Sequence, residues 1–244
     1  MKTNLCLSLA GDTIESLLGR VSASRKLHAD LIELRLDLIR RLDSSKISRI
    51  GEHLRGNEIL TIRSEAEGGG YLSNSHRELF SHQIISEIAP SFVDIEIQTL
   101  RKFPKLLKDL DNSRSKLIAS FHDLKGTKTQ SNLRRIIADL FSFEGINDKL
   151  FAAKVVSTAK SAEDNLKVLG LYSDLNQERK NTRQSLEPSK LVAFCMGRDG
   201  IPSRILSPFL GSPITYVSLA GEPVATGQLD ILTMRRILGV RASR

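Results

Sequence analysis

Eight short apolar runs recur along the chain, separated by longer stretches whose apolar residues have helical spacing. The runs occupy residues 4–10, 30–37, 58–64, 91–97, 115–123, 150–159, 190–197 and 213–220. Each intervening stretch has about the length of a crossover helix between two parallel strands. This alternation predicts an α/β fold, specifically a (β/α)8 TIM barrel formed by a single domain over residues 1–244. An open doubly wound sheet is the alternative, although no GxGxxG motif follows any run to favour dinucleotide binding.

Alternation within the predicted strands assigns side chains to two faces, one toward the helices and one toward the barrel lumen. Apolar residues occupy the first face, and we expect Phe121 there. Charged and polar residues occupy the second face, and we expect Gln98 and Asp37 among them. The charged residues predicted to converge in the lumen are Glu33, Arg35, Arg63, Asp94, Glu96, His122 and Lys154. Buried charges need partners or a ligand, and barrel enzymes react at the carboxyl ends of their strands, so the cluster indicates an active site.

Lys154 lies between apolar residues in LFAAKVVSTA. Burial and neighbouring arginines would favour its neutral, nucleophilic form. Imine formation with a ketone or aldehyde is the leading reaction for such a lysine, because it needs neither a metal nor a cofactor. His122 lies near the end of the preceding run, where an imidazole can both take and give a proton near neutral pH. The sequence therefore predicts Schiff-base chemistry assisted by a histidine.

The remaining composition favours few other functions. Cys6 and Cys195 lie in apolar runs, which indicates buried thiols, and the histidines at 28, 53, 76 and 82 lack metal-ligand spacing and should be exposed. No apolar stretch reaches the ~18 residues of a membrane span and no secretion signal is evident, so we expect a cytoplasmic protein. A net charge of +8 allows a nucleic-acid-binding barrel, but the basic residues are scattered over predicted helices, which favours no nucleic-acid partner.

The residues and their order resemble the type I 3-dehydroquinate dehydratase family over nearly the whole chain. The motifs that carry the resemblance are ELRLD (33–37), TIRSEAEGG (61–69), SFHD (120–123), AAKVV (152–156), MGRDGIPSR (196–204) and ATGQ (225–228). The resemblance implies a homodimeric barrel that dehydrates 3-dehydroquinate through a lysine Schiff base, in the shikimate pathway, with no cofactor and no metal. A class I aldolase is the alternative enzyme, but it does not account for the EGG, SR and GQ elements together.

The resemblance also implies roles for individual residues. Lys154 would attack the C3 ketone, and His122 would remove the C2 proton and protonate the hydroxyl that leaves C1. Glu67 would orient His122 and support its charged form, and Arg204 would pair with the substrate carboxylate. The residues implied to hold the hydroxyls and the ring, or to line the pocket, are Ser8, Glu33, Arg35, Arg63, Met196, Tyr216 and Gln228.

Two positions depart from the family pattern. Val224 stands where the family commonly has a serine, and Thr226 stands where it has a proline. We expect Thr226 to supply the hydroxyl contact that Val224 cannot make. Asp94 and Glu96 receive no role from the resemblance, and we interpret them as partners that balance the arginines.

Overall fold

The structure is a computed structural model that describes residues 3–142, 148–181 and 188–240. Its strands are β1 (Asn4–Leu9), β2 (Leu31–Arg35), β3 (Glu58–Thr61), β4 (Phe92–Glu96), β5 (Lys116–Asp123), β6 (Leu150–Thr158), β7 (Leu191–Met196) and β8 (Ile214–Val217). All neighbouring strands are parallel, in the order β7-β6-β5-β4-β3-β2-β1-β8. Each strand lies within one predicted run. The (β/α)8 barrel is therefore confirmed, and the doubly wound alternative is wrong.

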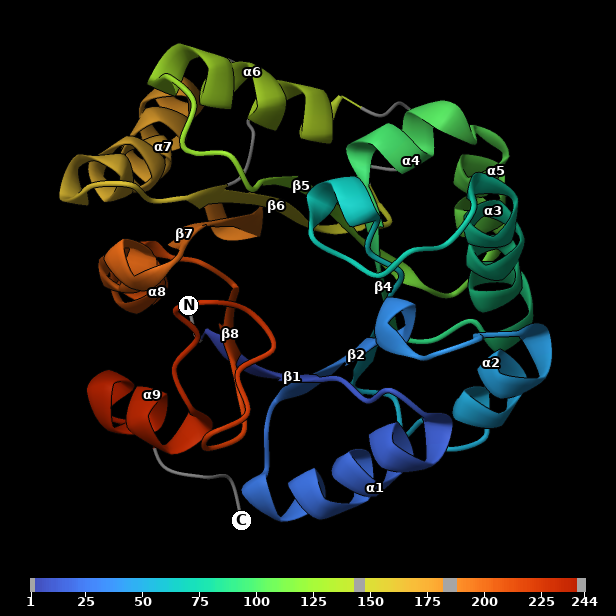
Figure 1. Cartoon of the computed structure of the whole chain (residues 1–244). Helices are drawn as coiled ribbons and strands as arrows, with labels where there is room; N and C mark the ends of the chain where they lie inside the picture. The colour runs from blue at the N-terminus through green and yellow to red at the C-terminus, as the bar shows by residue number, and fades with distance from the viewer. Residues whose placement is uncertain (1–2, 143–147, 182–187, 241–244) are drawn as a thin grey trace.

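Helices surround the strands on the outside (Figure 1). They are α1 (Ile14–Ser24), α2 (Ser44–Gly51), α3 (Asn74–Gln83), α4 (Ile97–Lys102), α5 (Lys105–Asn112), α6 (Gln130–Phe141), α7 (Ala162–Asn181), α8 (Ile201–Leu206) and α9 (Ile231–Leu238). Side-chain caps begin several of them: the hydroxyl of Thr13 accepts from Ser16 N at the start of α1, and a carboxylate oxygen of Asp230 accepts from Leu232 N and Thr233 N in α9. Among the described helices, none has the length and apolar character to cross a bilayer.

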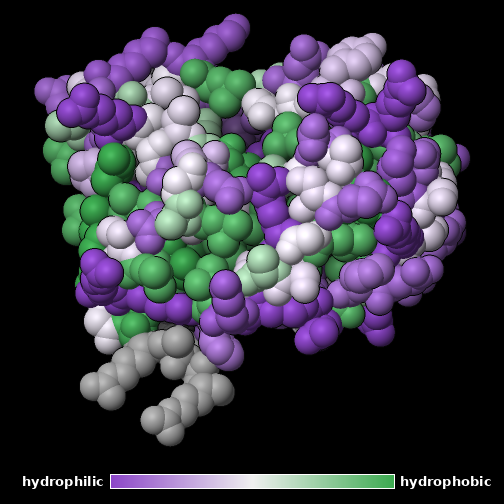
Figure 2. All heavy atoms as spheres, turned by 60° about the horizontal axis from the view of Figure 1, so that its bottom comes forward, coloured by the Kyte–Doolittle hydropathy of each residue, from purple (hydrophilic) through white to green (hydrophobic). Residues whose placement is uncertain are grey.

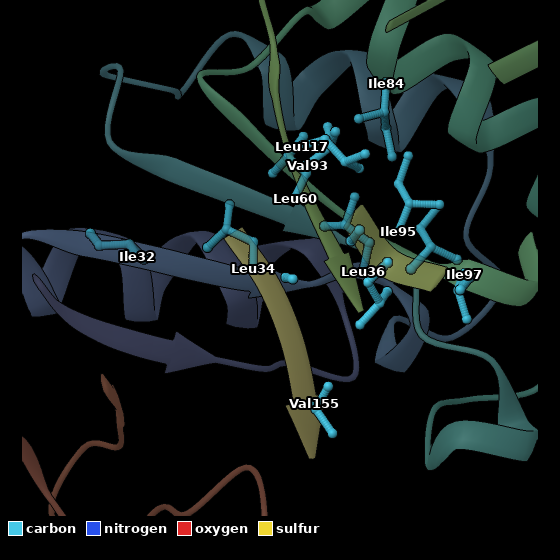
Figure 3. Close-up of a cluster of buried hydrophobic side chains, with 14 of the residues drawn as sticks. Ile32, Leu34, Leu36, Leu60, Ile84, Val93, Ile95, Ile97, Leu117 and Val155 are labelled. Atoms are coloured by element: carbon cyan, nitrogen blue, oxygen red, sulfur yellow. The ribbon is translucent and has the colours of Figure 1, made fainter. Parts of the chain in front are cut away.

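The predicted alternation of faces is visible in two separate apolar clusters. The larger lies between strands and helices and includes Leu34 of β2, Ile95 of β4 and Ile84, which follows α3 (Figure 3). Phe121 packs against the same cluster, as expected. The smaller cluster fills the barrel interior and consists mainly of Cys6, Leu31, Ile59, Ile118, Ala152, Val156, Val192, Phe194, Ile214 and Tyr216. It forms the apolar floor of the barrel, because most of these residues lie nearer the amino ends of the strands than the charged residues do.

The strand ends differ from the prediction at two positions. Gln98 is exposed, because β4 ends at Glu96 and the chain continues directly as α4, so the two-residue alternation stops there. Asp37 is buried as expected, but it lies in a turn after β2. The minor predictions hold: Cys6 and Cys195 are buried free thiols, and the histidines at 28, 53, 76 and 82 are exposed.

Candidate active site

A cavity of about 360 Å³ opens at the carboxyl ends of the strands. All three residues predicted to be catalytic and all nine predicted to bind substrate line it. Other lining residues, to which the sequence assigned no site role, are Gly68, Leu124, Val156, Thr158 and Phe194. Alternation could have found Val156 and Phe194, because they lie two residues from Lys154 and Met196 on the same strands.

Lys154 reaches the cavity from the middle of β6 and is only 4% exposed. Its Nζ donates to Asp94 Oδ2 at 2.9 Å, lies 3.8 Å from Glu33 Oε1, and sits 4.0 Å from the centre of the Tyr216 ring. The sequence predicts neighbouring arginines that would favour a neutral Lys154, whereas the structure places two carboxylates beside its Nζ. The strand register explains this, because β6 lies next to β5 and the inward residues of β2 and β4 converge on the same lumen.

Asp94 links the lysine to Arg63. Its Oδ1 accepts from Arg63 Nη2 at 2.8 Å and from Ser120 Oγ at 2.6 Å, while Oδ2 accepts from Lys154. Burial raises the pKa of Asp94, but Arg63 and Lys154 outweigh that effect and hold the pKa well below its usual range. Asp94 is therefore a permanent carboxylate between two cations, in agreement with the expectation that it balances an arginine.

Glu67 reaches His122, as the family resemblance implied. Its Oε2 lies 2.9 Å from His122 Nδ1 and also accepts from the backbone N–H of His122 at 3.0 Å. Glu67 ends a short turn at Glu65–Glu67, which is followed by close backbone packing: a Cβ on Gly69 would lie 2.0 Å from the carbonyl oxygen of Arg63. Only glycine fits there, which explains the EGG element.

The charge state of this pair differs from the expectation. Burial, followed by the cations Arg63 and Lys154, lowers the pKa of His122 well below its usual value. Burial, followed by the charge of Glu96, raises the pKa of Glu67 to about 8. Glu67 thus orients His122, but the surroundings favour a neutral imidazole rather than a charged one. A neutral ring is the form that a general base requires.

Arg204 forms a different kind of site on the other side of the cavity. It projects from α8, is 3% exposed, and stacks 4.5 Å from the centre of the Phe194 ring. Its Nη2 donates to Thr226 O at 3.3 Å and its Nε has no hydrogen-bond partner. Burial lowers the pKa of Arg204 to about 10, so the guanidinium is charged at neutral pH. Among the described residues no acid lies within ion-pair distance of it, which leaves a buried cation ready for an anionic ligand.

The side chain of Gln228 makes hydrogen bonds to the backbone that the sequence did not predict. Its Oε1 accepts from Val224 N at 2.9 Å and Ala225 N at 3.2 Å, and its Nε2 donates to Val217 O at 3.1 Å. Gly227 in the same loop has φ of +77°, and a Cβ there would lie 2.2 Å from Gly197 O. Gln228 therefore lines the cavity mainly as the residue that shapes the loop above it.

Comparison with known proteins identifies the family of this chain. Residues 5–244 match the family model described as Type I 3-dehydroquinase. The chain belongs to this family. It is 28% identical over 235 residues to the 3-dehydroquinate dehydratase of Methanocaldococcus jannaschii, with 96% of both chains covered. It is 31% identical over 232 residues to that of Pyrococcus abyssi, with 95% of both covered.

The fold of a type I 3-dehydroquinase is also found in solved structures similar to this one. The crystal structure of 3-dehydroquinate dehydratase from Geobacillus kaustophilus superimposes with a TM-score of 0.84 at 23% identity, covering 98% of this chain and 91% of that one. The family reaction, dehydration of 3-dehydroquinate in the shikimate pathway, is thus the activity predicted from the six motifs, and it makes the chain a hydro-lyase. The class I aldolase alternative is set aside.

Proposed function

We propose that Lys154 carries out the dehydration by forming an imine with the C3 ketone of 3-dehydroquinate. Water leaves as the imine forms. The protonated imine withdraws electrons from C2, so that His122 can remove a C2 proton and then return it to the hydroxyl that departs from C1. Because one histidine serves both transfers, the elimination is syn. Hydrolysis of the imine consumes one water, releases 3-dehydroshikimate and restores Lys154, with no cofactor needed.

One observation carries this proposal: the buried amine of Lys154 and the imidazole of His122 line the same cavity from adjacent strands, β6 and β5. The Lys154 residue is 4% exposed, and the His122 side chain is 9% exposed. Exclusion of water around the Lys154 side chain and the neutral His122 ring favours imine chemistry and proton transfer over hydrolysis.

The hydrogen bond to Glu67 determines when His122 is active. If Glu67 is protonated and donates to Nδ1, the neutral ring carries its hydrogen on Nε2 and has no lone pair to offer the substrate. If the Glu67–His122 pair loses that proton, Nδ1–H donates to the carboxylate and Nε2 becomes the base. The active form of the free enzyme is therefore the pair that has lost this proton.

The unpaired guanidinium supports a role for Arg204 in binding the substrate carboxylate. A planar fork of N–H donors suits a carboxylate, and an anion would neutralise the buried charge. Ser8, Glu33, Arg35, Arg63, Met196, Thr226, Tyr216 and Gln228 would contact the ring and its hydroxyls. Thr226 lines the cavity beside Val224, which agrees with its proposed hydroxyl contact.

Borohydride reduction in the presence of 3-dehydroquinate tests the proposal. We expect mass spectrometry to find the reduced adduct on Lys154 and no adduct in Lys154→Met. Lys167→Met is the matched control, because Lys167 is a partly exposed lysine that pairs with Asp164, and it should leave the adduct intact. Turnover without an adduct on Lys154 would contradict the mechanism.

The homodimer and the cytoplasmic location stay predictions. Hydrophobic side chains gather on the side where α8 and α9 lie in Figure 1 (Figure 2). The large hydrophobic side chains exposed along residues 206–237 are Leu206, Phe209, Leu210, Leu232 and Ile237, and Phe209 is 62% exposed. We propose this face as the dimer contact. Light scattering should give twice the chain mass for the wild type and a monomer for Phe209→Glu; a wild-type monomer contradicts the dimer.

A further inference from the structure

Glu96 is a buried acid to which the proposed reaction assigns no role. It is the last residue of β4 and is 2% exposed. Its Oε1 accepts from the backbone N–H of Ser64 at 2.6 Å, and its Oε2 accepts from Arg77 Nη2 at 2.8 Å and Thr99 Oγ1 at 3.2 Å. Three donors from three different segments therefore hold this carboxylate in one orientation.

Ser64 connects Glu96 to the loop that carries Glu67. The carbonyl oxygen of Ser64 accepts from Glu67 N at 3.0 Å and from Gly69 N at 2.7 Å. Ser64 therefore links the two acids: its N–H donates to Glu96, and its carbonyl oxygen accepts from the turn that carries Glu67. Moving Ser64 would move the carboxylate that orients His122.

Glu96 also acts on Glu67 through charge. Arg63 Nη1 lies 3.7 Å from Glu67 Oε2 and 3.7 Å from Glu96 Oε1, so the two carboxylates flank one guanidinium nitrogen. After burial, the charge of Glu96 is the largest cause that raises the pKa of Glu67. Arg77, which projects from α3 and is 9% exposed, partly offsets the charge of Glu96 from the other side.

Other charged groups also surround the Glu67–His122 pair. The charged groups that face Glu67 or His122 are Arg35 from β2, Arg63 from the β3 loop, Asp94 and Glu96 from β4, Lys154 from β6 and Arg204 from α8. Arg63 and Asp94 already neutralise each other in a close ion pair. Asp37 also holds this loop, through the backbone N–H groups of Arg63 and Gly70, whereas Glu96 bonds the loop at Ser64 and is also the largest charge that raises the pKa of Glu67.

We propose that Glu96 is a positioning residue for the Glu67–His122 base, fixing its loop through Ser64 and, together with Arg77, setting the pH at which the pair becomes active. This inference rests on the proposed role of His122 as the base. Arg77 contributes to the same effect, because its positive charge reduces the influence of the Glu96 charge on Glu67.

The test is the acid limb of the pH profile of kcat/KM, which reports the pair as it loses its proton in the free enzyme. In Glu96→Gln the loss of a neighbouring negative charge should move the limb to lower pH by about one unit. In Arg77→Gln the charge of Glu96 is no longer offset, so the limb should move to higher pH. If Glu96 only supported the fold, the acid limb would stay in place in both variants or would move in the same direction in both. Either result overturns the proposal.

Two controls separate this inference from others. Thr99→Val removes an uncharged partner of Glu96 and should leave the limb within about 0.3 units of the wild type, because the charge is unchanged. Borohydride trapping above pH 8 should give the Lys154 adduct in the wild type and in Glu96→Gln alike. Absence of the wild-type adduct refutes the proposed function, whereas an adduct in both proteins with an unmoved limb refutes only the role of Glu96. If Glu96→Gln does not fold, Arg77→Gln decides by itself.

Discussion

Two buried arginines face the cavity from opposite sides of the barrel, and their surroundings differ completely. Arg63, which follows β3, has Asp94 at 2.8 Å and Glu67 and Glu96 at 3.7 Å. Arg204, which follows β7, has an aromatic ring and one carbonyl oxygen, and among the described residues no acid. Both side chains are 3% exposed.

The difference shows how one cavity supports two tasks. Around Arg63 the described charges have partners before substrate arrives, so this wall is preorganised for the proposed proton transfer and imine formation. Around Arg204 the charge lacks a partner, so binding an anion removes an unfavourable buried charge and adds hydrogen bonds. We therefore expect substitutions on the two walls to have different consequences.

Arg63→Gln should have the largest effect, and chiefly on stability. Removing the cation leaves Asp94, Glu67 and Glu96 with reduced compensation in a buried site, and breaking such a pair costs about 3–5 kcal/mol of unfolding free energy. Urea denaturation measures this loss. A change below about 1 kcal/mol would mean that the acid-rich wall is not held together by Arg63.

His122→Ala should leave the acid-rich wall folded but slow the chemistry. Loss of a general base typically lowers kcat by about 10²–10⁴-fold. Because imine formation and proton transfer are separate steps, borohydride should still trap substrate on Lys154. Turnover near the wild-type rate would remove His122 from the mechanism, and loss of the adduct would show that it acts earlier.

Arg204→Gln should weaken substrate binding with little loss of stability. Replacing two charge-assisted hydrogen bonds should raise KM about 10²-fold while the melting temperature stays the same or rises, because an unpaired buried charge is removed. Arg198→Gln is a matched control on the same segment, since Arg198 does not line the cavity. A large loss of stability in Arg204→Gln would contradict the contrast between the two walls.

Thr226→Val should have the smallest effect. It removes one neutral hydroxyl beside Arg204, and a single such hydrogen bond contributes about 0.5–1.5 kcal/mol, or a rise in KM of about 3- to 10-fold. Thr226→Ser keeps the hydroxyl and should retain the wild-type KM. An unchanged KM in Thr226→Val would exclude the proposed replacement of the family serine.

Periodicity could predict much of this molecule because alternation in a strand is strictly local. It gave the eight strands, placed Lys154 and His122 inside, and placed Phe121 outside. It was wrong at Gln98, where a helix begins without a loop. It did not reveal Arg77, because a buried arginine on α3 has the same local pattern as an exposed one, and only packing against β4 distinguishes them.

The sequence by itself determined which groups share the cavity. The number of strands, and the face of the strand on which each side chain lies, follow from the pattern of neighbouring residues along the chain. The tertiary structure decided which charges are neighbours: two carboxylates beside Lys154, three acids around Arg63, and none around Arg204 among the described residues. Pairing of charges depends on distances of a few ångströms between strands far apart in sequence, and electrostatic energy changes steeply over such distances. For that reason the neutral His122, the raised pKa of Glu67 and the contacts of Glu96 became apparent only in three dimensions.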